Sequence, residues 1–516
     1  MRLAEPLAAL SLVSDLARGR PPDEALRACL LATALGRSLD LSEADLSDVY
    51  YAALLRSVGC TATSHEFAAV FAGDDVAIRG RGDMSDAAVP KEGLSLLWGA
   101  GRALTPAAHV RAFAAGAPKA KRAAAEGARA DCEVGARMAR RFGLGPGVEQ
   151  ALLQVFERWD GKGSPRGLKG DAIAVAARIA AVAYAAVMFE HEGGRPAALE
   201  VIGRWAGRIL DPSIAALVAR DAEALFDACS PEDPWVAAVD SEPASPRAVS
   251  ERELDEIARG FADAVDLKSP FMHGHSSGVA VLAERAAQGA GLPPDAVVAV
   301  RRAGLLHDLG RVGIPTGIWE KSGPLSTSDW EQVRLHTYHT ERILSRAPVF
   351  APIAQLAGLH HERMDGSGYH RGAPPAMLDE SARILAAADV FQALVEERPY
   401  RAAFEPAEAA RLLEETALDP AAARAVIEAA GQRSKRRTTL PAGITPRELE
   451  VLRLLVRGRS EKQIAAHLFI STSTVHTHVT HIYGKAEVST RAGLAMFAME
   501  HDLVRPGVAV GAPDID

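Results

Sequence analysis

An internal repeat constrains the fold of this 516-residue chain more than any other feature of its sequence. The segment FERWDGKGSPRG, which starts at Phe156, matches HERMDGSGYHRG, which starts at His361, 205 positions later. The pair Arg178-Ile179 matches Arg383-Ile384 at the same spacing, without a gap. Upstream, the stretch AALLRSVG at 52–59 resembles AGLLHDLG at 303–310. Self-similarity at a fixed spacing indicates that one structural unit occurs twice, so we expect two copies of one domain before the C-terminal segment.

The spacing of apolar residues indicates what kind of domain is repeated. Apolar side chains recur mostly every three or four residues, which is the period of an amphipathic helix. Apolar residues make up 48% of the chain, charged residues 24% and aromatic residues 5%, a balance that excludes wholesale disorder. We therefore expect a nearly all-α protein, and its length allows about three or four domains.

Cysteine content and charge narrow the compartment and the partners. Four cysteines are too few for a disulfide scaffold and none forms a CxxC pair, which favours a reducing, cytoplasmic location. The longest apolar run, 179–189, is shorter than the ~18–20 residues that cross a bilayer, so we expect a buried helix and no membrane contact. Glu5 and Asp15 interrupt the N-terminal apolar stretch, and we expect no signal peptide. The net charge of −8 excludes a polybasic nucleic-acid coat.

Histidine and aspartate residues cluster in the second copy. Imidazole and carboxylate groups are ligands that suit iron, manganese or zinc, and two adjacent pairs among the candidates argue against a purely packing role. The candidate metal ligands are His275, His307, Asp308, His336, His360, His361 and Asp389.

The repeat provides an internal control for this cluster. Glycines and charged residues suited to tight turns and a structural ion pair are shared by both copies, namely Asp160/Asp365, Gly161/Gly366, Gly163/Gly368 and Arg178/Arg383. The ligand-type positions diverge instead. In place of His307, Asp308, His336, His360, His361 and Asp389, the first copy has Arg56, Ser57, Asp131, Val155, Phe156 and Tyr184. We therefore expect the second copy to bind metal, and the first to bind none and to be inactive.

Residues from about Glu251 to Arg401 resemble an HD-GYP phosphohydrolase domain of the HD superfamily. The resemblance rests on four ordered blocks: LLHDLGRVGIP, RLHTYHTERIL, LHHERMDGSGYHRG and ARILAAADVFQALVEERPYR. It implies a helical fold that holds two or three metal ions, commonly iron or manganese, and hydrolyses cyclic di-GMP. It also implies that the seven candidates are metal ligands, with Asp308 bridging two ions. Because Phe271 occurs where three-metal members carry a glutamate, we expect two divalent ions.

Two metal ions close together can activate water and neutralise the charge on a phosphodiester, so no covalent protein nucleophile is required. Arg311 replaces the lysine that usually closes the HDxGK block, and a guanidinium can clamp a phosphate. We therefore predict Asp308 and Arg311 as catalytic residues. The predicted substrate-binding residues are Arg311, Gly366, Gly368 and Tyr369, although a plain surface turn explains this loop equally well. His370 replaces the proline of the GYP motif.

From Thr445 onward the sequence predicts short helices, each with a capping residue at its start. TPRE at 445–448 and SEKQ at 460–463 are capping boxes, Gly458 ends the first helix and Ser471 opens the third. Between 433 and 491, eleven basic residues occur against four acidic ones. This local excess of positive charge suits binding to nucleic acid, but an ordinary solvated face has the same property.

The order TPRELEVLRLL, SEKQIAAHLFIS, TVHTHVTHIYGKAEVSTR resembles the LuxR-type helix-turn-helix. The resemblance implies that residues 474–485 form the helix that enters the major groove of double-stranded DNA. The predicted DNA-binding residues are Ser473, Thr474, His476, Thr477 and Lys485. Since small helix-turn-helix domains gain affinity by pairing on two half-sites, we expect a homodimer that pairs through the first copy.

These features predict six segments and one leading function. The segments are a degenerate HD-like domain (1–230), a proline-rich linker that cannot continue a helix (231–250), an HD-GYP domain (251–430), a basic linker (431–441), a LuxR-type helix-turn-helix domain (442–505) and a tail (506–516). The leading hypothesis is a cytoplasmic transcriptional regulator in which hydrolysis of cyclic di-GMP to pGpG or GMP changes DNA occupancy. Two alternatives stay open: a non-catalytic nucleotide or metal sensor that controls DNA binding, and a phosphohydrolase for another phosphodiester.

Overall fold

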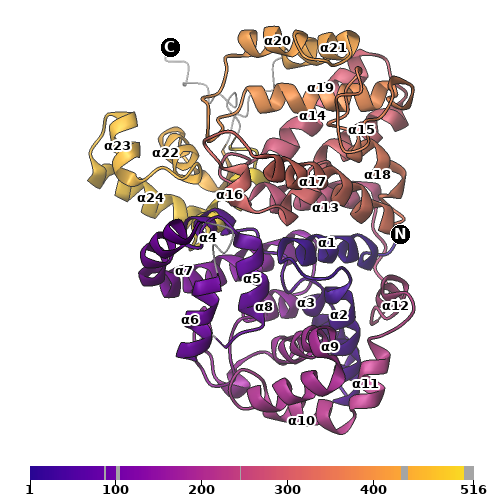
Figure 1. Cartoon of the computed structure of the whole chain (residues 1–516), viewed down its shortest axis with the longest axis vertical. Helices are drawn as coiled ribbons and strands as arrows, with labels where there is room; N and C mark the ends of the chain where they lie inside the picture. The colour runs from indigo at the N-terminus through magenta and orange to yellow at the C-terminus, as the bar shows by residue number, and fades with distance from the viewer. Residues whose placement is uncertain (87–88, 100–104, 245, 432–439, 505–516) are drawn as a thin grey trace. The chain divides into compact units, whose positions relative to one another are not determined.

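The computed structural model describes residues 1–86, 89–99, 105–244, 246–431 and 440–504 (Figure 1). Within this part of the chain every regular element is a helix, so the predicted all-α class is confirmed. Packing divides the chain into two compact units, the first built mainly from Met1–Ile257. The basic residues predicted for the second linker (Arg433, Lys435, Arg436 and Arg437) and the predicted tail lie outside the described residues.

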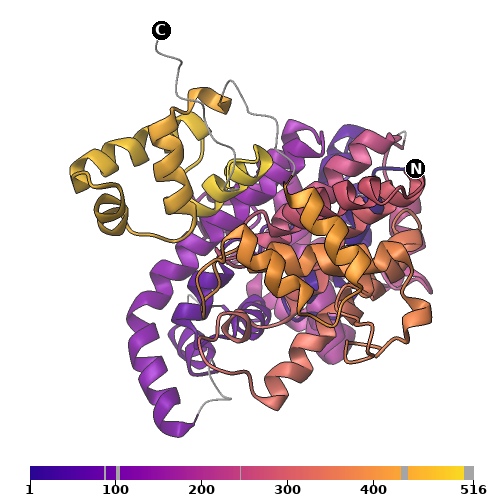
Figure 2. The same ribbon diagram turned by 90° about the horizontal axis from the view of Figure 1, so that it is seen from above.

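The first unit contains the N-terminal copy of the repeat. Its longest helix, α7, has 36 residues and is the long purple helix in Figure 2. The apolar run at 179–189 lies within α9, and most of its side chains are buried, which confirms the predicted buried helix. The helices are α1 (Ala4–Ala17), α2 (Glu24–Ser38), α3 (Glu43–Leu54), α4 (Ser64–Val70), α5 (Asp75–Asp83), α6 (Pro90–Gly99), α7 (Pro106–Arg141), α8 (Pro146–Leu152), α9 (Val175–Trp205), α10 (Pro212–Arg220), α11 (Ala222–Ala228) and α12 (Pro234–Asp240), with a short 3-10 turn η1 (Gly170–Ala172).

The second copy and the C-terminal domain follow. The helices of the second copy are α13 (Glu251–Asp266), α14 (His275–Gly289), α15 (Pro294–Leu306), α16 (Thr316–Trp319), α17 (Thr327–Arg346), α18 (Ala351–Gly358), α19 (Glu380–Leu394), α20 (Pro406–Glu414) and α21 (Pro420–Gly431), with the 3-10 turns η2 (Leu309–Gly313) and η3 (Pro375–Met377). The C-terminal domain contains η4 (Pro441–Gly443), α22 (Pro446–Val456), α23 (Glu461–Leu468), α24 (Thr472–Ala486) and α25 (Arg491–Glu500).

The two copies correspond helix by helix. In the first copy α2, α3 and α9 pack against one another, and α14, α15 and α19 do the same in the second copy. Both α2 and α14 follow a residue with a left-handed backbone, Asp23 at φ 72° and Gly274 at φ 80°. The elements α8 and α18, η1 and η3, and α9 and α19 each begin 205 positions apart. The sequence repeat is therefore a repeat of structure.

A glycine allows the same close approach in both copies. A Cβ atom on Gly310 would lie 2.0 Å from the carbonyl oxygen of His336 in α17. A Cβ atom on Gly59 would lie 2.1 Å from the carbonyl oxygen of Asp131 in α7. Real Cβ atoms do not approach an oxygen so closely, so only glycine lets the chain after α3 and α15 lie against the long helix. This contact helps to place His336 beside the segment that carries His307 and Asp308.

The shared arginine also has the predicted structural role. Arg178 lies 2.8 Å from Asp211 in the first copy, and Arg383 lies 3.0 Å from Asp419 in the second. Each arginine belongs to the first turn of its helix, α9 or α19, and joins that helix to an acidic residue that caps a later one. Each shared arginine therefore forms a structural ion pair, but its partner is Asp211 or Asp419 and not the shared Asp160 or Asp365.

The proline-rich stretch predicted as a linker contains a helix, α12, and that expectation was wrong in this part. Pro234 is the first residue of the helix, where a missing N–H costs nothing, and the Asp233 carboxylate accepts the backbone N–H groups of Trp235 and Val236. Trp235 is buried, and Tyr50 in α3 donates to the carbonyl oxygen of Ala238 at 2.9 Å. Prolines that forbid the continuation of one helix therefore begin another that packs on the first domain.

The C-terminal domain forms as its capping residues predict. Thr445 with Glu448 and Ser460 with Gln463 make complete capping boxes, and the Ser471 hydroxyl accepts the backbone N–H of Thr474 at the start of α24. Apolar side chains spaced three or four residues apart face inward and are buried: Leu449, Leu452, Leu455, Ile464, Val475, Val479 and Ile482. The fourth helix, α25, completes this small core.

Candidate metal centre

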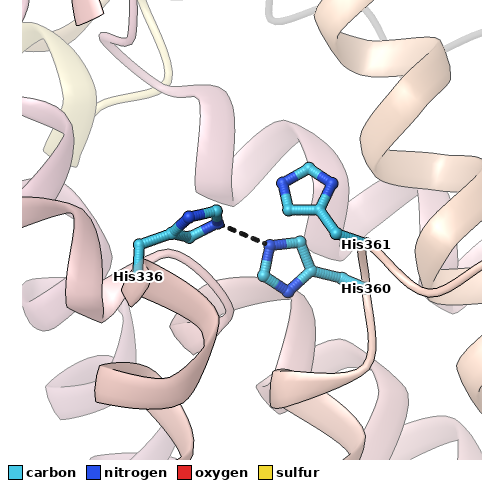
Figure 3. Close-up of side chains that lie close together, drawn as sticks. All are labelled: His336, His360 and His361. Atoms are coloured by element: carbon cyan, nitrogen blue, oxygen red, sulfur yellow. Dashed lines mark hydrogen bonds between the residues drawn. The ribbon is translucent and has the colours of Figure 1, made fainter. Parts of the chain in front are cut away.

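The seven predicted metal ligands come together in the second copy. Six of them are buried, and the His361 side chain is 21% exposed. Ligand atoms of His336, His360 and His361 lie within 4.8 Å of one another, and those of His275, His307 and Asp308 form a second such group. Figure 3 shows the first group, with the rings of His336 and His360 directed toward each other. Five different elements or their ends supply these residues: α14, α15, α17, α18 and α19.

Asp308 lies between the two groups of imidazoles. Its Oδ1 atom is 3.5 Å from Nε2 of His336 and 3.7 Å from Nε2 of His360. Its Oδ2 atom is 3.6 Å from Nε2 of His307 and 4.0 Å from Nε2 of His275. Because each oxygen faces a different pair of nitrogen atoms, this carboxylate is placed to bridge two cations.

Asp389 completes the arrangement from α19. Its Oδ1 atom is 3.2 Å from Nε2 of His275 and 3.7 Å from Nε2 of His307, and its Oδ2 atom is 3.9 Å from Nδ1 of His361. Imidazole nitrogens therefore surround the carboxylates of both Asp308 and Asp389.

Backbone carbonyl groups orient three of the histidines. Nδ1 of His307 lies 2.8 Å from the carbonyl oxygen of Gly304, and His360 contacts Ala357 in the same way at 2.7 Å. His336 repeats this contact with the carbonyl oxygen of Val333. An Nδ1–H group that donates to a carbonyl leaves Nε2 as a lone pair, so all three rings present a ligand atom to the cluster.

The protonation states of four of the seven predicted ligands suit metal binding. Burial opposes the charge on Asp308, but Arg311 and the neighbouring histidines hold its pKa below the ordinary value. Burial also opposes ionisation of Asp389, yet the hydrogen bond from His275 and the surrounding imidazoles lower its pKa as well. Burial lowers the pKa of His336 to about 4 and that of His360 to about 3. At neutral pH the carboxylates are charged and these two imidazoles are neutral, as metal ligands must be.

Two buried atoms of the cluster without a hydrogen-bond partner show whether these residues suit a metal ion. Among the described residues, Nε2 of His307 and Oδ1 of Asp308 are buried without a hydrogen-bond partner. A buried polar atom without a partner costs free energy, and a bound cation would satisfy both atoms at once. Imidazole nitrogen and carboxylate oxygen together are a donor set for divalent transition metals. The residues therefore fit a divalent metal centre.

Glu396 also belongs to the site, and the sequence interpretation missed it. Its Oε2 atom lies 2.8 Å from Nδ1 of His275, and Gln392 and Arg398 donate to its two oxygens. Burial disfavours a proton on His275, but the Glu396 carboxylate and the hydrogen bonds with Asp389 and Glu396 raise the pKa of His275 to about 10. Glu396 lies two residues beyond the end of α19, and no local sequence pattern connects it with His275, 121 positions away.

The predicted substrate-binding residues lie beside the cluster. Nη1 of Arg311 is 3.2 Å from Oδ2 of Asp308, and the side chain is 17% exposed. The Tyr369 ring stacks on His361, with centroids 4.7 Å apart and planes inclined by 31°. Both glycines of the loop have structural reasons: Gly366 has φ 75°, and a Cβ atom on Gly368 would lie 2.4 Å from the backbone of Glu362. Contact of this loop with a nucleotide stays a prediction.

The predicted DNA-binding residues differ in their surroundings. Four of them, Ser473, Thr474, His476 and Thr477, are exposed on the first half of α24. Lys485 instead lies 2.6 Å from Oε2 of Glu448 and donates to the carbonyl oxygen of Gly443. Its ammonium group therefore joins α24 to the start of α22, and this ion pair would compete with a DNA phosphate.

The matching positions of the first copy have other chemistry. Asp131, which replaces His336, forms a buried ion pair with Arg79 at 3.0 Å. Glu24 is the first residue of α2, where His275 begins α14, and it lies 2.7 Å from Arg20. The two groups of metal-type ligands found in the described residues both belong to the second copy.

Two family models match the chain. The model described as HD domain matches residues 133–214 and 259–422, so it includes part of each copy. The model described as bacterial regulatory proteins, luxR family, matches residues 442–498.

Known proteins are also similar to the chain. The 3'3'-cGAMP-specific phosphodiesterase 3 of Vibrio cholerae is 31% identical over 453 residues, which cover 85% of this chain and 97% of the relative. A cyclic di-GMP phosphodiesterase of Thermotoga maritima is 38% identical over 151 residues, 29% of this chain and 40% of the relative. A crystal structure of a cyclic GMP-AMP-specific phosphodiesterase from V. cholerae is 27% identical and superimposes with a TM-score of 0.57, covering 84% of this chain and 99% of that one.

These matches confirm the predicted domain types. None of the described helices combines the length and the apolar content that a transmembrane segment requires. The paired carboxylates and imidazoles, the helix-by-helix repeat and the similarity along nearly the whole of a relative agree with one another. The chain belongs to the HD-GYP family of metal-dependent phosphohydrolases, with a helix-turn-helix domain of the LuxR family at its C-terminal end.

Proposed function

We propose that the chain is a cytoplasmic phosphodiesterase that uses two divalent ions, iron or manganese, to hydrolyse a cyclic dinucleotide. The observation that carries this proposal is the position of Asp308, whose two oxygens face two sets of imidazoles while Oδ1 has no hydrogen-bond partner in the described structure. The ligands would divide into His336, His360 and His361 around one ion and His275, His307 and Asp389 around the other, with Asp308 shared.

Residues of the chain would bind and orient the substrate at this centre. Bound divalent ions supply Lewis-acid charge neutralisation and lower the pKa of a coordinated water. Arg311 adds a permanent positive charge beside Asp308, and its planar guanidinium can pair with two oxygens of one phosphate. The Tyr369 ring, which stacks on His361, offers an aromatic surface to a base. Hydrolysis then adds water across one phosphodiester bond and yields a linear dinucleotide.

The similarity favours 3'3'-cGAMP as the first substrate to test. The V. cholerae relative named for that nucleotide matches 85% of this chain, whereas the T. maritima relative named for cyclic di-GMP matches 29%. Both nucleotides carry two phosphodiester bonds between purine nucleosides, so the metal centre alone does not separate them. Cyclic di-GMP, the substrate expected from the sequence, is therefore tested beside it.

Chromatography of the products tests the activity. Full-length protein loaded with manganese or iron is incubated with each cyclic dinucleotide, beside Asp308→Ala and a matched control, Asp295→Ala, in which an exposed carboxylate of α15 is removed. We expect linear products from the wild type and Asp295→Ala, and a loss of at least about a thousandfold in Asp308→Ala. Intact substrates in a sample shown to contain two ions would contradict the proposal.

A sensor without turnover is the second candidate, and Arg311 in place of the family lysine is the observation that favours it. In that case the wild type would bind a cyclic dinucleotide tightly and release it unchanged. An Arg311→Lys variant would then gain hydrolysis, whereas it would retain or lose it if Arg311 already serves the reaction.

We also propose that the exposed face of α24 binds double-stranded DNA and that a homodimer makes the contact. Small hydroxyl-bearing side chains and His476 form this face, and such groups suit phosphates and base edges. DNA selected from random sequence by the full-length protein provides the probe. Affinity that falls steeply with salt, and that changes when the metal-loaded wild type is supplied with excess cyclic dinucleotide, would support coupling between the two domains. Equal DNA affinity with and without the nucleotide would contradict it.

A further inference from the structure

The first copy contains a cavity of about 890 Å³ where the second copy has its metal centre. Four of the residues that line it, Arg56, Val155, Phe156 and Tyr184, occupy the positions of His307, His360, His361 and Asp389. The cavity belongs entirely to the first structural unit. Its volume lies within the range of small-molecule sites, roughly 300–1,000 Å³.

These replacements remove the imidazole and carboxylate groups that would bind a metal, and Arg56 adds a positive charge. A guanidinium is protonated at all ordinary pH values and has no lone pair to offer, and a phenyl ring has none either. Arg56 lies over both rings, with Cζ 5.3 Å from the centroid of Phe156 and 4.8 Å from that of Tyr184. The positively charged guanidinium of Arg56 therefore lies at the position where the second copy has its predicted metal ligands.

Several polar groups in the wall have unused hydrogen-bonding capacity. Among the described residues the Arg56 guanidinium has no hydrogen-bond or ion-pair partner, and its Nε atom is buried. The Tyr184 hydroxyl is also buried and unpaired, in a side chain that is 4% exposed. Nη1 of Arg18, a residue that is 3% exposed, is the third such group. Burying three polar groups without hydrogen bonds costs free energy, so a ligand with acceptor atoms would be stabilised by contacting them.

The charges around the cavity favour an anion. Five cationic residues line it, Arg18, Arg56, Lys121, Arg158 and Lys162, against two acidic ones, Asp83 and Glu157. Arg18 is paired with Asp83 and Arg158 with Asp86 and Asp160, so the positive charge available to a ligand comes from Arg56, Lys121 and Lys162. Both acidic groups are already engaged. Asp83 pairs with Arg18 at 2.6 Å, and Glu157 accepts the backbone N–H groups of Arg166 and Leu168. Their carboxylates are therefore held by other groups, which leaves Arg56 available to a bound anion.

We propose that this cavity is a second, metal-independent binding site for a nucleotide. The phosphate would contact Arg56, the Tyr184 hydroxyl and Arg18, in a geometry where charge-assisted hydrogen bonds replace metal coordination. The base would pack against the aromatic wall, which also includes Phe71 and Trp205. The site binds without hydrolysis, since the two carboxylates in its wall, Asp83 and Glu157, are held by other groups, and it does not depend on the activity proposed for the second copy.

Calorimetric titration of full-length protein tests the site. The protein carries Asp308→Ala, so that a bound cyclic dinucleotide is not consumed, and the probes are 3'3'-cGAMP, cyclic di-GMP, GMP and AMP. We expect one of these to bind with one site per chain that persists in excess EDTA. Adding Arg56→Met should lower the affinity by about tenfold to a hundredfold, the usual effect of losing a hydrogen bond to a charged group.

Matched variants separate binding from folding. Arg37→Met removes an exposed arginine of α2 and should leave the titration unchanged. Tyr184→Phe removes only the unpaired hydroxyl and should weaken binding even if Arg56→Met proves poorly folded by circular dichroism. Failure of all four probes to bind in EDTA, or affinity that is the same with and without Arg56 and the Tyr184 hydroxyl, would overturn the proposal. Hydrolysis by the second copy can succeed or fail independently of either result.

Discussion

Replacing Glu396 by glutamine tests how the chain controls its metal centre. The carboxylate contacts Nδ1 of His275 at 2.8 Å and is itself held by Gln392 and Arg398, so Glu396→Gln keeps the shape and removes one negative charge. Loss of such a supporting carboxylate lowers metal affinity by about 10- to 100-fold. This is the expected deficit when protons do not compete for the imidazole.

Protons do compete at neutral pH, and the variant changes that competition. The pKa of His275 is about 10 in the metal-free protein, so only about one molecule in a thousand has a neutral imidazole at pH 7. Metal binds the neutral form, and the apparent affinity of the wild type should therefore rise about tenfold per pH unit from pH 6.5 to 9. Glu396 is the main cause that raises this pKa, so in Glu396→Gln the pKa falls and the rise with pH flattens.

Competition with a chromophoric chelator for Mn²⁺, repeated across this pH range, measures both effects. We expect the variant to be weaker than wild type at pH 9 and to approach or overtake it near pH 7. Glu380→Gln, which removes an exposed carboxylate from the first turn of α19, the helix that ends just before Glu396, should follow the wild-type curve. Parallel curves for wild type and Glu396→Gln would refute the assignment of the His275 proton to Glu396.

Three other changes test separate parts of the chain. Gly310→Ala places a Cβ atom 2.0 Å from the His336 carbonyl oxygen, so metal content measured by mass spectrometry should fall; full occupancy would show that the close approach is dispensable. Arg79→Met leaves Asp131 buried without its partner and should cost about 3–5 kcal/mol in urea unfolding. Burial raises the pKa of Asp131 to about 6, above its unfolded value, so the unpaired carboxyl becomes neutral as the pH falls. The free energy of unfolding that Arg79→Met loses should therefore be smaller at pH 5 than at pH 8. An equal loss of unfolding free energy at both pH values would contradict this. Thr477→Glu adds an anion to α24 and should abolish DNA binding in fluorescence anisotropy while leaving hydrolysis unchanged, and unaltered DNA affinity would exclude that face.

The repeat made much of the fold predictable. A gapless spacing of 205 positions aligns α8 with α18 and α9 with α19, so similar motifs are followed or preceded by corresponding helices. The capping boxes at Thr445 and Ser460 were equally informative, since a cap is a contact between residues three positions apart. The prolines at 231–250 were misleading because proline can either end a helix or occupy its first position. Pro234 begins α12, and burial of Trp235 stabilises this helix against the first domain.

Long-range contacts account for what the sequence interpretation missed in the site. Glu396 contacts a histidine 121 positions away, and no local pattern links the two. Lys485 was predicted to bind DNA, and its ion pair with Glu448 was missed for the same reason, since it joins residues 37 positions apart in different helices. The charge of Arg56 was visible in the sequence, but its lack of an ion-pair partner among the described residues was not, because that property depends on which side chains surround it.

The sequence by itself determined the helical class, the repeat, the ligand types and the caps, because periodicity, composition and short-range hydrogen bonds are local properties of a chain. Only the tertiary structure decided which oxygen of Asp308 faces which imidazole, which buried atoms remain unpaired and where a cavity is left. The protonation states of the histidines also depend on both sequence and tertiary structure. The identity of a histidine is written in the chain, but burial and a distant carboxylate shift its pKa, and the fold brings these together.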